Sequence, residues 1–346
     1  MEPLSRIKAA LLLLHAGDSL GASTEFQHHS EIALLDPSSL RRIRGGGIFD
    51  WPAGHATDDT DMTRAVLLAY RDLLLPSSSS STTTTTTPNN EHKTTDGTTT
   101  TLDAVQLSAA HFLRWLEGDW PLRTRGQRPV DIGNATLQGL RRYQRTKDPY
   151  TSGAGPNQAG NGSLMRCVPT ALFRRDDASI LRESEGISAV THNDPRCTAS
   201  CAAYNILARR LVDGRGPDDA LRAAEAVASR LNDEVHQAML AGRKLDLADL
   251  AAGGPPEEQA YSGYVLHSLS LAVAAVLDRR DAVTVMVDII RIGNDTDTNA
   301  AIAGALLGAR DGMDAVPQDW RDALQFGDEF EQVAEEIHRL VVAGKT

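Results

Sequence analysis

Apolar residues recur along most of the chain at the spacing of amphipathic helices, and the alternation typical of strands is scarce. The pattern predicts helices over residues 5–22, 65–75, 102–117, 136–145, 196–212, 217–231, 234–240, 261–277 and 300–309, and a helix pair within 320–342. One apolar run, 283–292, is a candidate strand. We therefore expect a mainly α-helical protein that forms one domain over residues 1–346.

Residues 76–101 interrupt this pattern with runs of Ser and Thr. A segment of such low complexity cannot bury a core, because it has almost no apolar side chains. We expect a disordered loop between two helices and assign it no catalytic role.

Composition narrows the class of protein. The 346 residues are 41% hydrophobic and only 5% aromatic, as suits a soluble helical protein. A net charge of -11 argues against nucleic-acid binding, and no apolar stretch is long enough to span a membrane. Three cysteines form no even disulfide framework, which indicates a reducing compartment. We expect a cytoplasmic monomer, with a nuclear pool left open.

Two clusters of carboxylate and hydroxyl side chains each precede an apolar helix. Their members are Thr57, Asp58 and Asp59 in the first cluster and Asp295, Asp297 and Thr298 in the second. Asp and Thr commonly cap helices, so one such cluster alone indicates a cap more often than a ligand set. Two clusters that meet across a bundle would instead present the hard oxygen donors that Mg²⁺ or Mn²⁺ prefers. The doubled pattern predicts a site for one or two divalent ions.

Other acidic motifs fit this chain poorly. An EF-hand loop that starts at Asp295 requires Gly and Glu where the chain has Ala300 and Leu306. A haloacid-dehalogenase motif requires Thr or Val in place of Asn299, and a terpene-synthase aspartate box requires an acid in place of Met62.

Further candidates for the site lie between the two clusters or just before the first. Glu25 follows the first helix beside Phe26, where a carboxylate is either solvated or an interior acid. Asp131 and Asn134 precede a helix that either residue is placed to cap, and Asp131 equally suits a cleft. The Gly-rich run 160–163 suits a phosphate but matches no standard phosphate-binding fingerprint. His192 is more often a structural hydrogen-bonding residue than a catalyst in such a position.

These segments, in this order, resemble the ADP-ribosylglycohydrolase family, most closely its dinitrogenase reductase-activating members that act on ADP-ribosylarginine. The matching segments are GDSLG at 17–21, EF at 25–26, GGG at 45–47, TDDT at 57–60, VDIGN at 130–134, GNGSLMR at 160–166, THN at 191–193 and DTDT at 295–298. One motif alone would be weak, but this series spans nearly the whole chain.

The resemblance implies an all-α, orthogonal helical bundle with a dinuclear Mg²⁺ or Mn²⁺ site in a cleft. By position, the metal ligands are Thr57, Asp58, Asp59, Asp295, Asp297 and Thr298. The implied catalytic residues are Glu25, Asp59, Asp297 and Asp131. The implied substrate-binding residues are Asn134, Gly160, Asn161, Gly162, Ser163 and, beside the diphosphate, His192. Asp61 stands where Glu is common and is expected to face outward.

The implied reaction is metal-dependent removal of mono-ADP-ribose from modified proteins by cleavage of the N-glycosidic bond to arginine. The implied partners are an ADP-ribosylated protein and ADP-ribose, and Tyr150 and Phe49 are candidates to pack against adenine. Serine-linked ADP-ribose and O-acetyl-ADP-ribose remain alternative substrates. A non-catalytic ADP-ribose-binding relative is a further alternative, although crowded carboxylates repel one another without a cation and so argue against a retired site.

Overall fold

The computed structural model describes residues 2–75, 91–93, 99–254 and 261–344. The helices are α1 (Pro3–Gly21), α2 (His29–Ile32), α3 (Asp58–Leu74), α4 (Ala104–Leu116), α5 (Asn134–Thr146), α6 (Pro169–Phe173), α7 (Asp177–Ala189), α8 (Pro195–Val212), α9 (Pro217–Leu231), α10 (Asp233–Gly242), α11 (Leu247–Ala251), α12 (Val265–Leu277), α13 (Ala282–Ile292), α14 (Thr296–Asp311), α15 (Gln318–Ala323) and α16 (Gly327–Val342). Two short 3₁₀ helices are η1 (Ser39–Arg41) and η2 (Met313–Ala315). The expected all-α architecture is confirmed.

The predicted strand at 283–292 is wrong, because this segment is helix α13. Asp281 caps the helix by accepting a hydrogen bond from the backbone N–H of Thr284. Val285, Met286 and Ile289 are all buried at helical spacing. A short run of Val and Ile between polar residues does not distinguish a strand from a buried helix, and here the cap decides.

Two strands lie within the segment that was expected to be disordered. Strand β1 (Glu91–Lys93) pairs antiparallel with β2 (Thr99–Thr101), and Glu91 lies opposite Thr101. Residues 76–90 and 94–98 lie outside the described residues, so the disorder of this segment stays a prediction.

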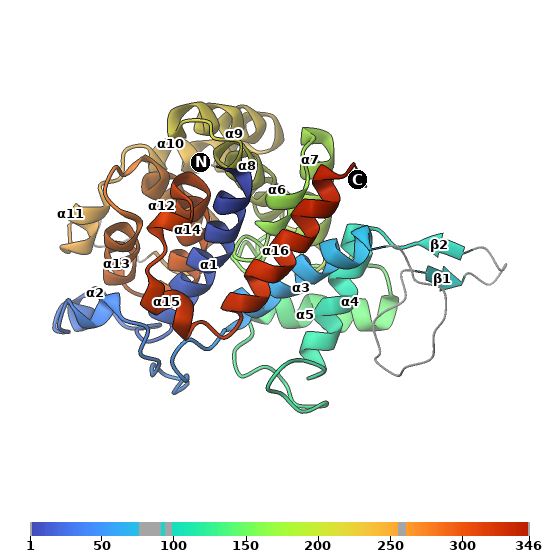
Figure 1. Cartoon of the computed structure of the whole chain (residues 1–346), viewed down its shortest axis with the longest axis horizontal. Coiled ribbons are helices and arrows are strands. Elements are labelled where there is room, and N and C mark those ends of the chain that lie inside the picture. The colour runs from blue at the N-terminus through green and yellow to red at the C-terminus, as the bar shows by residue number, and fades with distance from the viewer. Residues whose placement is uncertain (1, 76–90, 94–98, 255–260, 345–346) are drawn as a thin grey trace.

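Helix α1 runs through the middle of the molecule (Figure 1). From Ala9 to Gly21 every residue is buried, so this part of the helix is covered by the core on all sides. Leu11 and Leu14 belong to one large apolar cluster of the core, whereas Leu12 and Leu13 belong to a second. The helix therefore joins the two halves of the hydrophobic core.

Helix α14 packs directly against α1, backbone to backbone. A Cβ atom added at Gly17 would lie 2.4 Å from the carbonyl oxygen of Ala300, and one at Gly304 would lie 2.3 Å from that of Leu13. Only glycine allows so close an approach at these positions. These glycines on the two helices thus place the start of α14 beside the end of α1.

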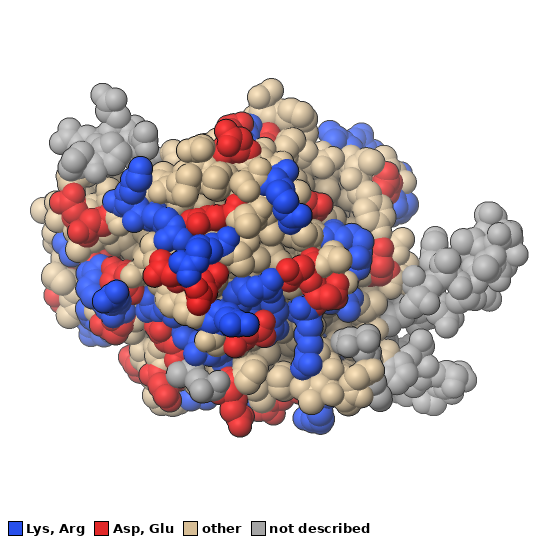
Figure 2. Space-filling view, turned by 90° about the horizontal axis from the view of Figure 1, so that it is seen from above, with Lys and Arg blue, Asp and Glu red and all other residues tan. Residues whose placement is uncertain are grey.

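The surface carries interleaved charges rather than one sign. Figure 2 shows Lys and Arg side chains alternating with Asp and Glu on the face seen from above. Arg243, for example, pairs with both Glu225 and Asp218. Among the described residues, no helix is long and apolar enough to cross a membrane.

Candidate active site

The two acidic clusters begin two helices in different ways. Thr57 is the N-cap of α3, and its Oγ1 accepts a hydrogen bond of 3.4 Å from the backbone N–H of Asp59. Asp295 occupies the N-cap position of α14 but its side chain makes no capping bond. It accepts instead a hydrogen bond of 2.6 Å from Nδ2 of Asn161. A cap therefore explains Thr57, but it does not explain the Asp295 carboxylate.

The structure brings the two clusters into contact. Oδ2 of Asp59 accepts hydrogen bonds from Oγ1 of Thr298 at 3.3 Å and from Oγ1 of Thr57 at 3.4 Å. Oδ1 of Asp59 and Oδ1 of Asp297 are both buried without a hydrogen-bond partner in the described part of the chain. Buried carboxylate oxygens without partners are costly, and they are the kind of atom that a cation satisfies.

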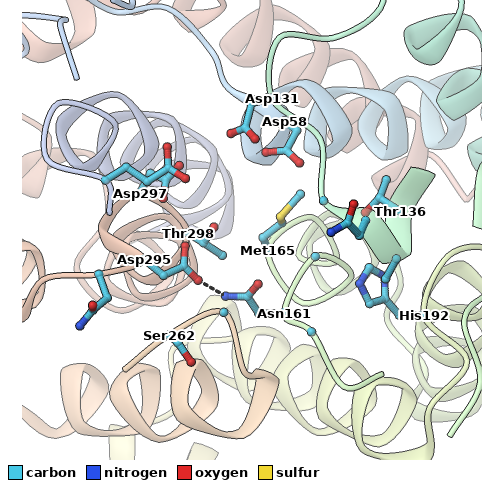
Figure 3. Close-up of a pocket in the computed structure, with 18 of the residues that line it drawn as sticks. Asp58, Asp131, Thr136, Asn161, Met165, His192, Ser262, Asp295, Asp297 and Thr298 are labelled. Carbon is cyan, nitrogen blue, oxygen red and sulfur yellow. Dashed lines mark hydrogen bonds between the residues drawn. The ribbon is translucent and has the colours of Figure 1, made fainter. Parts of the chain in front are cut away.

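A second convergence of carboxylates lies on the cleft side of this contact. Glu25, Asp131 and Asp297 each offer an oxygen, and these three oxygens lie within 4.8 Å of one another. Figure 3 shows Asp58 beside Asp131, and Asp297 across from them. Glu25, expected either as a solvated group or as an interior acid, is 7% exposed, and its Oε2 is buried without a partner among the described residues.

Burial and mutual repulsion disfavour the charged forms of these acids. The pKa of Glu25 is raised to about 8, first by burial and then by the charge of Asp131. Burial raises the pKa of Asp131 to about 6, and burial with neighbouring carboxylates raises the pKa values of Asp58 and Asp297 well above the usual range. A divalent cation would reverse this effect. The residues present therefore fit hard divalent cations.

Asp18 is a residue of the site whose role the sequence did not reveal. It is fully buried on α1, and its Oδ2 accepts hydrogen bonds from the backbone N–H groups of Thr57 at 3.1 Å and Thr60 at 3.2 Å. The hydroxyl of Thr60 donates to the same oxygen. Asp18 thus fixes the first turn of α3. A carboxylate within a long apolar helix is the sequence signal for such a role.

A cleft of about 480 Å³ extends from the carboxylates. Its acidic end is formed by Glu25, Asp58, Asp131 and Asp297, since Glu25 lies with Asp131 and Asp297. Its other end is formed by Thr136, Gly160, Gly162 and His192, since both glycines lie against the His192 ring. Met165 lies between the two ends in Figure 3. Asn134 and Asn161 also line the cleft. The site therefore has one acidic half and one half with neutral polar groups.

Neither Asp131 nor Asn134 caps α5. Gly133 occupies the N-cap position without any side-chain bond, and Asn134 is the first residue of the helix. Both Asp131 and Asn134 line the cleft instead, which is the alternative that the sequence left open for Asp131.

Ser163 and Asp61 lie elsewhere than the sequence indicated. Ser163 is buried behind the cleft wall, where its Oγ accepts hydrogen bonds from Ser188 at 2.9 Å and from the Cys201 thiol at 3.5 Å. Asp61 does not face outward, because it accepts hydrogen bonds from the indoles of Trp115 at 2.9 Å and Trp120 at 2.7 Å. These indoles come from α4 and the segment after it, so Asp61 anchors α4 to α3.

The aromatic candidates for adenine also lie outside the cleft wall. Tyr150 lines a different cavity and hydrogen-bonds to Asp103. Phe49 is not among the described residues that line the cleft. Its ring lies edge-on to that of Phe26, with 6.4 Å between the ring centroids, and Phe26 does line the cleft. Phe26 was noted in the sequence only as the neighbour of Glu25.

Fold and site together define a helical protein whose cleft gathers buried carboxylates suited to divalent cations. The sequence model of the ADP-ribosylglycohydrolase family matches residues 1–345. The chain belongs to the ADP-ribosylglycohydrolase family. The family and the enzyme class, expected from the motifs, are thereby confirmed.

Individual relatives agree over nearly the full length. The ADP-ribosyl-dinitrogen reductase glycohydrolase of Rhodospirillum rubrum is 30% identical over 342 residues, which cover 98% of this chain and 95% of that protein. The ADP-ribosylarginine hydrolase Tri1 of Serratia proteamaculans is 26% identical over 97% of this chain and 80% of its own length. A solved ADP-ribosylglycohydrolase-related protein complex is similar with a TM-score of 0.73 and 25% identity, covering 98% of this chain and 99% of that one.

Proposed function

We propose that this protein removes mono-ADP-ribose from modified proteins by hydrolysing the N-glycosidic bond to arginine. The observation that carries the proposal is the convergence of Glu25, Asp131 and Asp297 at one end of the cleft. A guanidinium retains its positive charge, so a carboxylate-lined end suits an arginine acceptor better than an uncharged serine. The relative named an ADP-ribosylarginine hydrolase supports the same acceptor, and the relative named for dinitrogen reductase supports a modified protein as substrate.

Phe26 adds support for a guanidinium at this end. Its side chain lines the cleft yet is 61% exposed, and its backbone has a φ of 62°, which is rare for a bulky residue. The strained turn is held by a hydrogen bond of 2.8 Å from the N–H of Phe26 to the carbonyl of Asn294. A planar guanidinium stacks favourably on an exposed aromatic face, whereas serine offers neither the plane nor the charge.

The chain also supplies the ligands for two divalent cations, Mg²⁺ or Mn²⁺. We assign these ligands to Thr57, Asp58, Asp59, Asp295, Asp297 and Thr298. Bound cations would polarise water and the ribose hydroxyls as Lewis acids. Asp58→Ala and Asp297→Ala should each lose bound Mn²⁺ and turnover, whereas Asp314→Ala, which alters an exposed aspartate beyond α14, should retain both. Unchanged metal content in the first two variants would refute the assignment.

Within the cleft, the side chains divide the remaining work. Glu25, whose Oε2 is buried without a partner among the described residues, is placed to take the proton of the attacking water, and the cluster aspartates Asp59 and Asp297 are the alternatives for this step. Asp131 orients the guanidine. Asn134 and Asn161 bind the substrate along the cleft wall, and the diphosphate lies against 160–162 and His192.

The test is release of ADP-ribose from arginine-modified and serine-modified peptides, side by side, with Mg²⁺, with Mn²⁺ and with chelator. Metal-dependent release from the arginine peptide alone is expected. Release from serine alone would keep the site and overturn the acceptor. Binding of ADP-ribose without release from either peptide would point to O-acetyl-ADP-ribose as substrate or to a non-catalytic binding protein.

A further inference from the structure

His192 lies at the end of the cleft opposite the carboxylates (Figure 3). Its side chain is 2% exposed and is closely confined by the glycine-rich segment. A Cβ atom at Gly162 would lie 2.9 Å from its Cε1, and one at Gly160 would lie 3.5 Å from its Nε2. The ring therefore packs against these glycines, with its Nε2 edge toward the segment that lines the cleft.

The other nitrogen of this ring contacts one buried side chain, which is held in turn by a second. Nδ1 of His192 lies 2.8 Å from Oγ1 of Thr191, and that hydroxyl lies 2.6 Å from Nη2 of Arg166. Both Thr191 and Arg166 are completely inaccessible to solvent. Arg166 is held in turn by a bond of 2.8 Å from Nη1 to the carbonyl of Gly162 and by the ring of Phe112 beneath its guanidinium.

The directions of these hydrogen bonds follow from the groups themselves. A guanidinium only donates, so the Thr191 oxygen must accept from Arg166. The Thr191 hydroxyl proton then needs an acceptor, and Nδ1 of His192 is the acceptor that the described residues provide. If Nδ1 carried a proton instead, two donors would meet at Oγ1 and the buried hydroxyl proton would be left without an acceptor.

We infer that Arg166 and Thr191 are positioning residues that fix His192 as the tautomer with its proton on Nε2, so that the ring donates a hydrogen bond into the cleft. Among the described residues, the hydrogen bond to this ring is at Nδ1, and no protein group accepts from Nε2. The inference rests on the proposed function for the identity of the acceptor, which is an oxygen of the ADP-ribose diphosphate.

The imidazole is also held neutral. Burial, and after it the positive charge of Arg166, lower the pKa of His192 to about 3. A neutral donor with one fixed direction differs from a histidinium, which would donate from both nitrogens and would oppose the donated bond from Thr191. His192 thus binds the diphosphate as a neutral hydrogen-bond donor with a fixed direction, and it does not act as a charged histidinium beside Arg166.

The experiment measures the tautomer and its consequence in the full-length protein. ¹⁵N-histidine labelling with long-range ¹H–¹⁵N correlation reports which nitrogen of His192 is protonated, and a His192→Asn sample assigns its signals. Thr191→Val removes the hydroxyl at nearly constant shape, and Thr191→Ser retains it. Isothermal titration with ADP-ribose and with Mn²⁺ follows for wild type and both variants.

Wild type and Thr191→Ser should show the proton on Nε2 and bind ADP-ribose alike. Thr191→Val should lose the single tautomer and bind ADP-ribose about three- to tenfold more weakly, the range for one hydrogen bond, with unchanged Mn²⁺ affinity. A proton on Nδ1 in wild type would overturn the inference without any variant. Equal ADP-ribose affinity in all three proteins, or no binding by wild type, would overturn the role toward the diphosphate. Failure to cleave the arginine peptide would instead refute the proposed function alone.

Discussion

The close contact between α1 and α14 predicts that Gly21→Ala, which adds one methyl group outside the cleft, will greatly reduce turnover. An ideal Cβ at Gly21 would lie 2.4 Å from the backbone nitrogen and Cα of Asp297 and from the carbonyl oxygen of Thr296. All three atoms are backbone atoms, so no side chain can rotate away. Restoring an ordinary contact of 3.4 Å requires the first turn of α14 to move by about 1 Å. Asp297 would move with it.

Gly21→Ala is expected to reduce the free energy of unfolding only slightly but to reduce turnover strongly. Overpacking of this kind costs about 1–3 kcal/mol, and the better helix propensity of Ala returns about 1 kcal/mol. The net loss of unfolding free energy is therefore modest, about 0–2 kcal/mol. A displacement of about 1 Å at a reacting group costs about 100-fold in turnover. Gly21→Ala should thus fold, yet turn over at about 1% of the wild-type rate with weakened Mn²⁺ binding.

Gly308→Ala is the matched control in the same contact. Its Cβ would lie 2.2 Å from the carbonyl oxygen of Ala9, an equally severe approach. Gly308 follows Asp297 by eleven residues, about 16 Å along the helix axis, so the displacement falls at the far end of α14. Thermal unfolding, Mn²⁺ titration and ADP-ribose release should be measured on both variants well below their melting temperatures. Wild-type turnover in Gly21→Ala, or an equal loss in Gly308→Ala, would refute the reasoning.

Three further outcomes follow from the same contacts. Asp61→Ala should lower the free energy of unfolding, measured in urea, by about 2–6 kcal/mol, because two buried indole donors lose their acceptor. Asp61→Asn should lower it less. A fall in the Mn²⁺ affinity of the folded variant would contradict the assignment of Asp61 as a residue that is not a metal ligand. The raised pKa values of Asp18, about 7, and Glu25, about 8, mean that the folded state binds more protons than the unfolded chain above pH 4. Their stabilising contribution is therefore lost as pH rises through 7 to 8, so the melting temperature without cations should fall from pH 6 to pH 8.5. Mn²⁺ should raise the melting temperature more at pH 8.5 than at pH 6. A cation-free melting temperature that rises with pH would contradict this expectation. Replacing 76–101 with a short Gly-Ser linker should leave ADP-ribose release nearly unchanged, because none of the cleft-lining residues that the structure describes falls in that range. A large loss would assign the segment a role in substrate binding.

Much of the fold could be predicted from the sequence because most helices carry a clear apolar period and a local cap. Helix α9 was predicted with its observed bounds, since Pro217 begins it and its apolar face repeats regularly. The segment of α13 could not be assigned in the same way, because its Val and Ile residues suit a strand or a buried helix equally. The cap by Asp281 decides only once its partner Thr284 is seen.

The site divides similarly. The clusters that contain Asp58 and Asp297 could be found because carboxylates crowded at helix starts are locally unusual. The directions of Asp61 and Ser163 could not, because each is set by a partner distant in sequence, such as Trp115 for Asp61. Asp18 shows the same limit, because its partners are the backbone N–H groups of Thr57 and Thr60, which donate to its carboxylate and which the side-chain pattern does not identify.

Helix α1 sets the spacing of the site as well as the spacing of the core. Asp18 holds the first turn of α3 through the N–H of Thr57, and Gly21, about 4.5 Å further along the helix axis, receives the first turn of α14. Glu25 follows four residues after the helix ends at Gly21. Both acidic helix starts, those of α3 and α14, are therefore positioned by contacts with the same helix, α1. Neither can shift toward the other without moving α1, which packs within both apolar clusters. Close packing of that core is what keeps mutually repelling carboxylates together before any cation binds.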